Sequence, residues 1–320
     1  LVPEAGLESA RVEATAQALL TFVGAGYDHK EGDYKNTCRM AILWLRSQVS
    51  PNGCVGTAPR PRVREQAFAA MAMSEAYGLS GDNVLKPIAE SMLEYLLAMR
   101  RPGSGWGETF TSEPNVLDTT LAIIAIKSAR MAGLEPAVVE SYNEAAEFLQ
   151  GMVVDEGDQR FHVRFNRFRR AAVGPDGTEL NRLPICEAGW VACMLFMGKA
   201  DLNSPTVKAL AEDVCSEHHR PQWQAGKIDY LHWWVGSLCM YQVGGKSWQA
   251  WEAAVSKTLL ESQRGYTAHD KSQQTRAETL VEYGSWDPVE ASCIYTGRVG
   301  ATAFGGLTLQ IYYRYLRLKD

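Results

Sequence analysis

Five acidic side chains stand at the starts of apolar segments that are rich in small residues: Glu13, Glu65, Asp118, Glu187 and Asp229. Helix dipoles and capping stabilise acidic residues in a first helical turn, and this structural role alone would explain the pattern. The alternative is a ring of carboxylates around one opening, where mutual repulsion raises some pKa values and supplies a general acid or base. On this hypothesis Asp118 and Glu187 are the candidate catalytic residues, with Asp118 as the first choice.

Aromatic side chains gather in the same parts of the chain and could bind a ligand. Core packing is the simpler explanation for aromatic residues on helices. The segment DYLHWWVG (229–236), however, places aromatic groups all round one helix, so at least one is expected to face a central space. An aromatic-lined cavity suits an isoprenoid, a carbocation or a sugar ring. The candidate ligand-binding residues of this kind are Trp106, Tyr230, His232, Trp234 and Trp286.

An arginine-rich insertion spans about 152–183. Phe161, Val163 and Phe165 alternate at period two before a Gly-Pro-Asp-Gly sequence, which predicts a short hairpin or an extended flap. Solvated loop charge would explain its arginines, whereas an anion site would use them to bind phosphate or carboxylate oxygens. We expect residues 160–170 to fold back with Arg164 or Arg167 near Asp118, Glu187 or a bound anion. Arg298 is a further candidate ligand-binding residue.

Composition excludes several classes of function. The chain has 32 basic and 37 acidic side chains and a net charge of −5, so overall electrostatics give no support for a nucleic-acid partner. Glycine-rich phosphate loops, Gly-x-Ser-x-Gly elbows and His-Glu-x-x-His pairs are absent, and no cofactor is predicted. Seven scattered cysteines read as reduced, buried thiols, which favours the cytoplasm.

The ends and the hydropathy of the chain bear on its context. No run of apolar residues reaches the roughly 18 that a membrane span requires. The chain begins at Leu1 in a polar stretch, so we expect an upstream signal peptide, anchor or domain to be missing from it.

Apolar residues recur at three- and four-residue spacing, which predicts an all-α protein with about eleven helices. Two kinds of helix alternate: six with many small residues, which allow close approach on several sides, and five that end in a repeated Gln- or Gly-containing phrase. The expected ranges are 9–26, 35–49, 64–78, 83–100, 117–132, 136–151, 184–198, 204–217, 229–243, 246–263 and 298–316.

The repeated phrase predicts a helical-pair repeat of about fifty residues. Leu45, Leu96, Leu149 and Leu260 mark its period. Helical pairs of this kind bury their faces only against neighbouring pairs. Because both the first and the last helix remain apolar, we expect a closed α/α toroid over residues 1–320, with six inner helices and five outer ones.

The phrases RRPGSGWG (100–107), ESQ (261–263) and GSW (284–286) resemble the QW-type repeat of the prenyltransferase and squalene-cyclase superfamily. The closing stretch GSWDP (284–288) with GRVGATAFGGLTLQIYYRY (297–315) looks like the last repeat of uncharacterised bacterial members. This resemblance implies an α/α toroid over nearly the whole chain.

The catalytic motifs of that superfamily are missing. There is no Asp-x-Asp-Asp proton donor and no Cys-Gly-Glu-Gln thioester. Asp213 and Cys215 have the local spacing of the prenyltransferase zinc ligands, with His218, His219 and His232 nearby in sequence. Since this pair falls near the end of an expected outer helix, away from the cavity, we predict no metal site.

The resemblance therefore implies a toroid that binds an apolar or polyisoprenoid ligand in a central cavity, with its enzyme status open. One alternative is a lyase or hydrolase acting on an anionic polysaccharide, because helical toroids host such enzymes and the arginine-rich insertion beside carboxylates would fit an acidic chain. Another alternative is a protein-interaction scaffold. Fold alone does not separate them.

Overall fold

The computed structural model describes residues 4–56, 61–135, 139–167, 183–272, 281–290, 293 and 295–314. In this part of the chain helices dominate, and the single small sheet lies in the insertion. The helices that form an inner ring are α1 (Glu4–Gly24), α3 (Val63–Ser80), α5 (Val116–Met131), α7 (Pro184–Phe196), α9 (Tyr230–Val243) and α12 (Gly297–Leu309).

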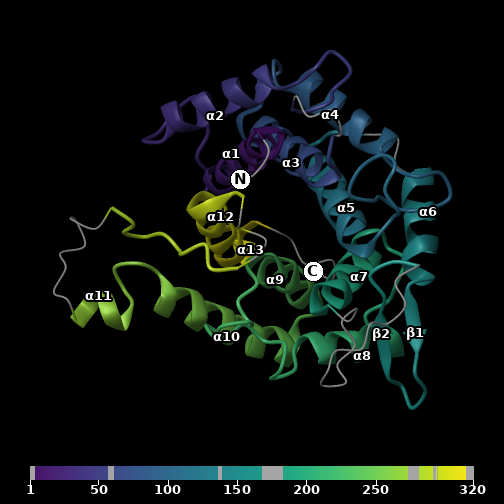
Figure 1. The fold of residues 1–320 in the computed structure, drawn as a ribbon. Coiled ribbons are helices and arrows are strands. Elements are labelled where there is room, and N and C mark those ends of the chain that lie inside the picture. Colours follow the sequence, from purple (N-terminus) through teal and green to yellow (C-terminus); the bar gives the residue numbers. More distant parts are fainter. Residues whose placement is uncertain are drawn as a thin grey trace.

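Each inner helix packs against the next one in chain order, and α12 packs back against α1, which closes the ring (Figure 1). The outer helices are α2 (Lys35–Ser47), α4 (Lys86–Ala98), α6 (Val139–Gln150), α8 (Pro205–Val214) and α10 (Gly245–Ser262). Each outer helix contacts the inner helix that precedes it. The predicted all-α toroid of six inner and five outer helices is therefore confirmed.

Small residues explain why the inner helices can be surrounded on all sides. Twelve residues of α7 are buried, and its Gly189 lies so close to Thr120 of α5 that an added Cβ would come within 2.4 Å of the threonine hydroxyl oxygen. Gly236 of α9 makes the same kind of approach to the indole of Trp251 on α10. Because close packing leaves no room for a methyl group, these glycines set the spacing of the ring.

Three tryptophans repeat one contact around the ring. The indole Nε1 of Trp106 donates a hydrogen bond to the carbonyl oxygen of Leu96 on α4, at 2.7 Å. Trp190 makes the equivalent bond to Leu149 on α6 at 2.9 Å, and Trp286 makes it to Leu259 on α10 at 2.8 Å. Each bond satisfies a carbonyl near the end of an outer helix, where intrahelical partners run out.

The structure corrects one position of the predicted repeat. Leu45, Leu96 and Leu149 are fully buried as the spacing predicts, but Leu260 is 54% exposed. Leu259 is the buried equivalent, and its carbonyl accepts the bond from Trp286. The error arose from counting period alone, since a one-residue shift turns a helical side chain by about 100°.

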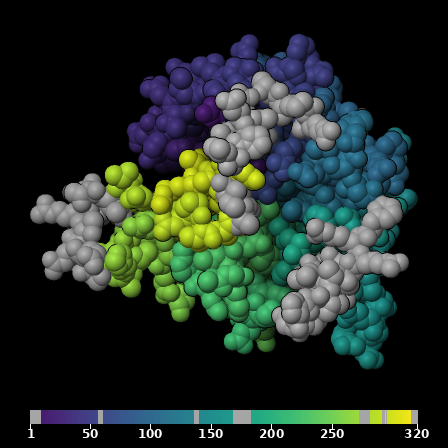
Figure 2. Space-filling model, in the orientation of Figure 1, coloured from purple at the N-terminus to yellow at the C-terminus, as the bar shows by residue number. Residues whose placement is uncertain are grey.

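Two further helices were not predicted. The expected helix at 298–316 is broken at Gln310 into α12 and α13 (Ile311–Arg314), and residues beyond 314 lie outside the described part. The short helix α11 (Ala268–Ser272) belongs to a segment that extends outward beyond the outer ring (Figures 1 and 2).

The described part of the insertion contains a hairpin that the sequence did not predict. Strand β1 (Val153–Asp155) pairs antiparallel with β2 (Phe161–Val163), so a turn precedes the alternating Phe161–Phe165 segment. Asp158 and Gln159 adopt positive φ in this turn, next to Gly157. The Gly-Pro-Asp-Gly sequence at 174–177 lies outside the described residues.

Candidate functional site

A half-buried arginine at the start of α3 pairs with a carboxylate of α1 and acts electrostatically on two others. Arg64, in the first turn of α3, donates from Nε to Oε1 of Glu13 on α1 at 2.6 Å. Its positive charge also lowers the pKa of both Asp118 on α5 and Asp229 at the start of α9, although burial outweighs this effect in each case. The charge of this arginine therefore acts on both Asp118 and Asp229, which lie at the N-terminal ends of α5 and α9.

Asp118 is held as a nearly buried acid. The side chain of Asn115 caps α5: its Oδ1 accepts from the Asp118 amide at 2.9 Å, and its Nδ2 donates to Oδ2 of Asp118 at 2.5 Å. Burial raises the pKa of Asp118 to about 6, against the lowering effects of Asn115 and Arg64. A carboxyl group with this pKa is partly protonated near neutral pH, as a general acid requires.

Asp229 is the N-cap of α9. Its Oδ1 accepts from the main-chain amide of His232 at 2.8 Å, which fixes the carboxylate at the helix end. Burial raises its pKa, while the His232 amide and Arg64 act in the opposite direction. The side chain of Asp229 is nevertheless half-buried and lines an open cavity.

A cavity of about 660 Å³ opens beside Asp229. Loop residues Trp223 to Asp229 form one wall, and Val289 with Glu290 forms the other. Trp223 is 40% exposed, and its ring packs against the buried rings of Tyr230 and Trp233, with centroids 6.3 and 6.5 Å away. An exposed indole and two carboxylates therefore border one open space.

Glu187, the second candidate catalytic residue, holds the insertion. It is fully buried in the first turn of α7, where its Oε1 lies 3.4 Å from the main-chain amide of Val163. The carbonyl oxygen of Phe165 accepts from the Val116 amide at 2.9 Å, at the start of α5. The insertion thus folds back onto the N-terminal ends of α5 and α7, as expected.

The insertion makes these two contacts through its main-chain atoms. The side chains of Arg164 and Arg167 are exposed, and the Arg167 guanidinium lies 5.7 Å from the ring centroid of Phe148 on the outer helix α6. Arg169 and Arg170, also part of the arginine-rich sequence, lie outside the described residues.

The aromatic candidates lie in several places. Trp106 and Trp286 are the buried anchors of outer helices described above. Trp234 packs against Phe68 and Phe304, with centroids 5.8 and 5.9 Å away, so that rings from α9, α3 and α12 meet across the interior of the ring. Tyr230 is buried, and its hydroxyl donates to the Asp287 carbonyl at 2.9 Å.

His232 is buried between α9 and the loop after α8. Burial lowers its pKa to about 4, so the ring is neutral at physiological pH. Its Nε2 lies 3.3 Å from the carbonyl oxygen of His219, which places the ring proton on Nε2 as the donor. The ring meets that of Trp251 edge-on, at 5.6 Å.

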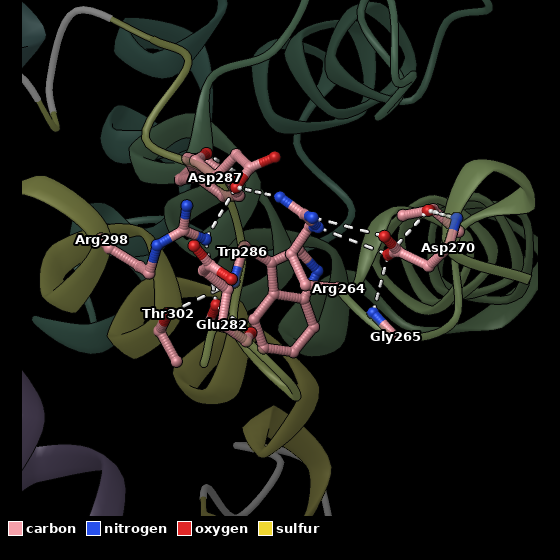
Figure 3. A network of polar contacts seen from close by, with 11 residues as sticks. Arg264, Gly265, Asp270, Glu282, Trp286, Asp287, Arg298 and Thr302 are labelled. Atoms are coloured by element: carbon pink, nitrogen blue, oxygen red, sulfur yellow. Dashed lines mark hydrogen bonds and ion pairs between the residues drawn. The ribbon is translucent and has the colours of Figure 1, made fainter. Parts of the chain in front are cut away.

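Arg298 belongs to a polar network around Asp287 (Figure 3). Asp287 Oδ1 lies 2.7 Å from Nη1 of Arg298 and 3.4 Å from Nη1 of Arg264. Arg264 in turn contacts Asp270, whose pKa falls to about 2 through bonds from the Gly265 amide and Thr267. The network fixes the loop that carries Trp286 and the second wall of the cavity.

Two residues of this site escaped sequence analysis. Arg64 adjoins the acidic Glu65, and nothing in the sequence indicates that it pairs with Glu13 on another helix. Trp223 lies in a polar loop, and a large aromatic residue among Gln and Gly residues was a signal that could have been used.

The described residues contain no group of three or more His, Cys, Asp or Glu side chains that could hold a metal ion. Asp213 and Cys215 lie at the end of outer helix α8, and the pKa of His219 is raised chiefly by its bond with Asp213. All seven cysteines are free thiols. None of the described helices is long and apolar enough to cross a bilayer.

The fold and the acidic ring opening define an α/α toroid with a polar site at one end, and solved structures share this fold. A structure described as a novel α-amylase from Clostridium perfringens has a TM-score of 0.59 at 10% identity, over 94% of this chain and 86% of that one. A cellobiose 2-epimerase from Bacillus thermoamylovorans has a TM-score of 0.59 at 13% identity, over 93% and 87%.

A family 76 glycoside hydrolase from Bacteroides thetaiotaomicron has a TM-score of 0.59 at 12% identity, over 94% of this chain and 69% of that one. No protein-family model and no curated protein matches the sequence. At these identities the likeness concerns the fold alone.

These findings correct the expected ligand. The resemblance to prenyltransferases and squalene cyclases predicted the toroid but assigned it a polyisoprenoid ligand in a central cavity. The similar structures reported above are carbohydrate-active toroids. Phe68, Trp234 and Phe304 also pack against one another where that ligand was expected. The apolar-ligand prediction is therefore wrong. The aromatic residues and the QW-like tryptophans on which it was based pack the ring of helices together.

Proposed function

We propose that the protein is an enzyme that hydrolyses a polysaccharide at the N-terminal end of its helical ring. The observation that carries this proposal is a pair of aspartates at N-terminal ends of inner helices: Asp229 lines an open cavity, and Asp118, in the first turn of α5, is a buried carboxyl group with a raised pKa. Two carboxyl groups are the usual equipment for hydrolysis of a glycosidic bond. The carbohydrate enzymes among the similar structures support the same class of substrate.

Asp118 is the general acid in this mechanism. Its raised pKa keeps a population protonated near neutral pH, and the proton passes to the glycosidic oxygen as the bond from that oxygen to the anomeric carbon breaks. Asn115 holds Oδ2, so the other oxygen, Oδ1, carries the proton.

Asp229 is the general base. It lines the cavity, and a water molecule that attacks the anomeric carbon gives its proton to the carboxylate. The bond from the His232 amide and, to a smaller extent, the charge of Arg64 favour the ionised form of Asp229. Glu187 is a positioning residue, since it holds the main chain of the insertion at the edge of the opening.

The test is release of reducing ends from a panel of starch, mannan, mixed β-glucan and polygalacturonate. We expect activity on at least one polymer, and Asp118→Asn to lower kcat by at least about a hundredfold. Glu212→Gln, an exposed change on outer helix α8, is the matched control and should retain full activity. Equal activity of Asp118→Asn and the unchanged protein, or no cleavage of any polymer, would refute the proposal.

A further inference from the structure

The cavity beside Asp229 has two walls that come from distant parts of the sequence. The first wall is the loop from Trp223 to Asp229, and the second is formed by Val289 and Glu290. The cavity volume of about 660 Å³ lies within the range of roughly 300–1,000 Å³ typical of ligand-binding pockets. The space is therefore large enough for a sugar residue and part of its neighbour.

Asp287 ties the two walls together. Its carbonyl oxygen accepts from the hydroxyl of Tyr230, behind the first wall, and from the amide of Val289 in the second wall, each at 2.9 Å. Its carboxylate is held by Arg264 and Arg298 (Figure 3). Because both walls depend on this fixed residue, the cavity is formed before any ligand enters, which lowers the cost of binding.

The first wall presents an aromatic platform. Trp223 is supported from behind by Tyr230 and Trp233, both fully buried, so its indole is held while 40% of the residue stays exposed. The hydroxyl of Thr258 on α10 donates to the carbonyl of Pro221 at 3.1 Å and anchors the start of this loop. A supported, exposed indole face can pack against the C–H groups on the apolar face of a pyranose ring.

The charged lining of the cavity is acidic. Asp229 and Glu290 are its two ionisable side chains. Among the described cations, Arg264 and Arg298 contact Asp287, Lys227 donates to Gln222 within the loop at 3.3 Å, and Arg64, whose charge acts on Asp229, pairs with Glu13. Carboxylates accept hydrogen bonds from sugar hydroxyl groups, whereas a uronate or sulfate group here would meet like charge.

We propose that this cavity is a subsite for an uncharged sugar unit, stacked on Trp223 and hydrogen-bonded to Asp229 and Glu290. The inference rests on the proposed function for the identity of the ligand as a glycan, and it narrows that glycan to one whose unit next to the cleaved bond carries no negative charge. This differs from the anionic polysaccharide suggested by the arginine-rich sequence. The described arginines of that sequence, Arg160, Arg164 and Arg167, are exposed and do not line this cavity.

The experiment is isothermal titration calorimetry in the Asp118→Asn background, so that the oligosaccharides are not cut during the titration. The probes are the neutral hexasaccharides of α-glucose, β-glucose and mannose, and hexagalacturonate. We expect at least one neutral probe to bind, and hexagalacturonate to bind at least about tenfold more weakly. Adding Trp223→Ala should weaken neutral binding by at least about tenfold, as for a central aromatic contact.

Two further variants separate the subsite from general effects on the fold. Tyr313→Ala removes an aromatic side chain that is exposed at the other end of the ring, and it should leave binding unchanged. Glu290→Gln should bring the affinity for hexagalacturonate closer to that for the neutral probe. The melting temperatures of both variants are measured as a control for correct folding.

Binding that is insensitive to Trp223→Ala, hexagalacturonate binding as tightly as the neutral probes, or no binding of any neutral probe would each overturn the inference. These results are distinguishable from failure of the proposed function. Cleavage that depends on Asp118 but not on Trp223 would leave the enzyme and remove the subsite. Binding that depends on Trp223 without any cleavage would leave the subsite and remove the proposed enzyme activity.

Discussion

Each end of the helical ring holds one arginine beside an acidic side chain, but the two arrangements differ. At the C-terminal end, Arg314 of α13 pairs with Glu75 of α3, and its Nη1 donates to the carbonyl of Leu20 at 3.2 Å. Ser128 of α5 donates to the same glutamate. At the N-terminal end, Arg64 is shared among Glu13, Asp118 and Asp229.

Helix dipoles favour Asp118 and Asp229 at helix N-termini and Arg314 at a helix C-terminus, but they oppose Arg64 in the first turn of α3. What differs is compensation. Glu75 is paired directly with Arg314, whereas burial raises the pKa values of Asp118 and Asp229 in spite of the charge of Arg64. The Arg314–Glu75 pair joins α13 to α3, whereas the raised pKa of Asp118 suits a proton donor.

The largest effect on stability is expected from breaking the compensated pair. Arg314→Met leaves Glu75 nearly buried without its cation and should cost about 3 kcal/mol of unfolding free energy, measured by urea denaturation. The double variant with Glu75→Gln should recover at least half of this loss, because no charge is then stranded. An equal loss in both variants would show that packing, not charge compensation, is the cause.

At the N-terminal end of the ring, by contrast, replacing a carboxyl group should raise the free energy of unfolding. A pKa of about 6 for Asp118, instead of 3.8 in the unfolded chain, means that the folded protein binds this proton more tightly, so the group lowers stability as pH rises from about 4 to 6. Asp118→Asn removes a penalty of up to about 3 kcal/mol, and we expect it to stabilise the protein by about 2 kcal/mol at pH 8 and little at pH 4.

Asp270→Asn is the control for this prediction. The pKa of Asp270 is lowered to about 2, so its stabilising contribution is present above pH 4 and is lost as pH falls towards 2. Its replacement should therefore lower the melting temperature at pH 7. If Asp118→Asn were also destabilising at pH 8, Asp118 would be a structural carboxylate like Asp270.

The smallest effect concerns the shared arginine itself. If Asp118 is the general acid, kcat/KM falls as pH rises through its pKa. Arg64 lowers that pKa, so Arg64→Gln should move this alkaline limb upward by about half a pH unit to one unit. If the alkaline limb of the kcat/KM profile stays in place or moves to lower pH, Arg64 does not lower the pKa of Asp118.

Periodicity and composition determined the architecture of this protein. Apolar spacing predicted the eleven main helices, most of them to within a few residues, and small residues marked the helices of the inner ring, because a helix buried on all sides cannot carry bulky side chains everywhere. The acidic residues at the helix starts were also visible, and Asp118 was selected among them. The register of Leu259 and the break at Gln310 were missed, since period alone does not locate either.

The tertiary structure decided which of those residues act together. Ring closure brings Arg64 to Asp118 and Asp229, which lie 54 and 165 positions away in the sequence, and burial gives Asp118 its raised pKa. The same closure turns Trp106 and Trp286 into anchors of outer helices, and it sets Trp223 opposite Val289 across a cavity. Charge sharing and desolvation depend on distances between helices, and a sequence pattern carries no information about those distances until the ring is closed.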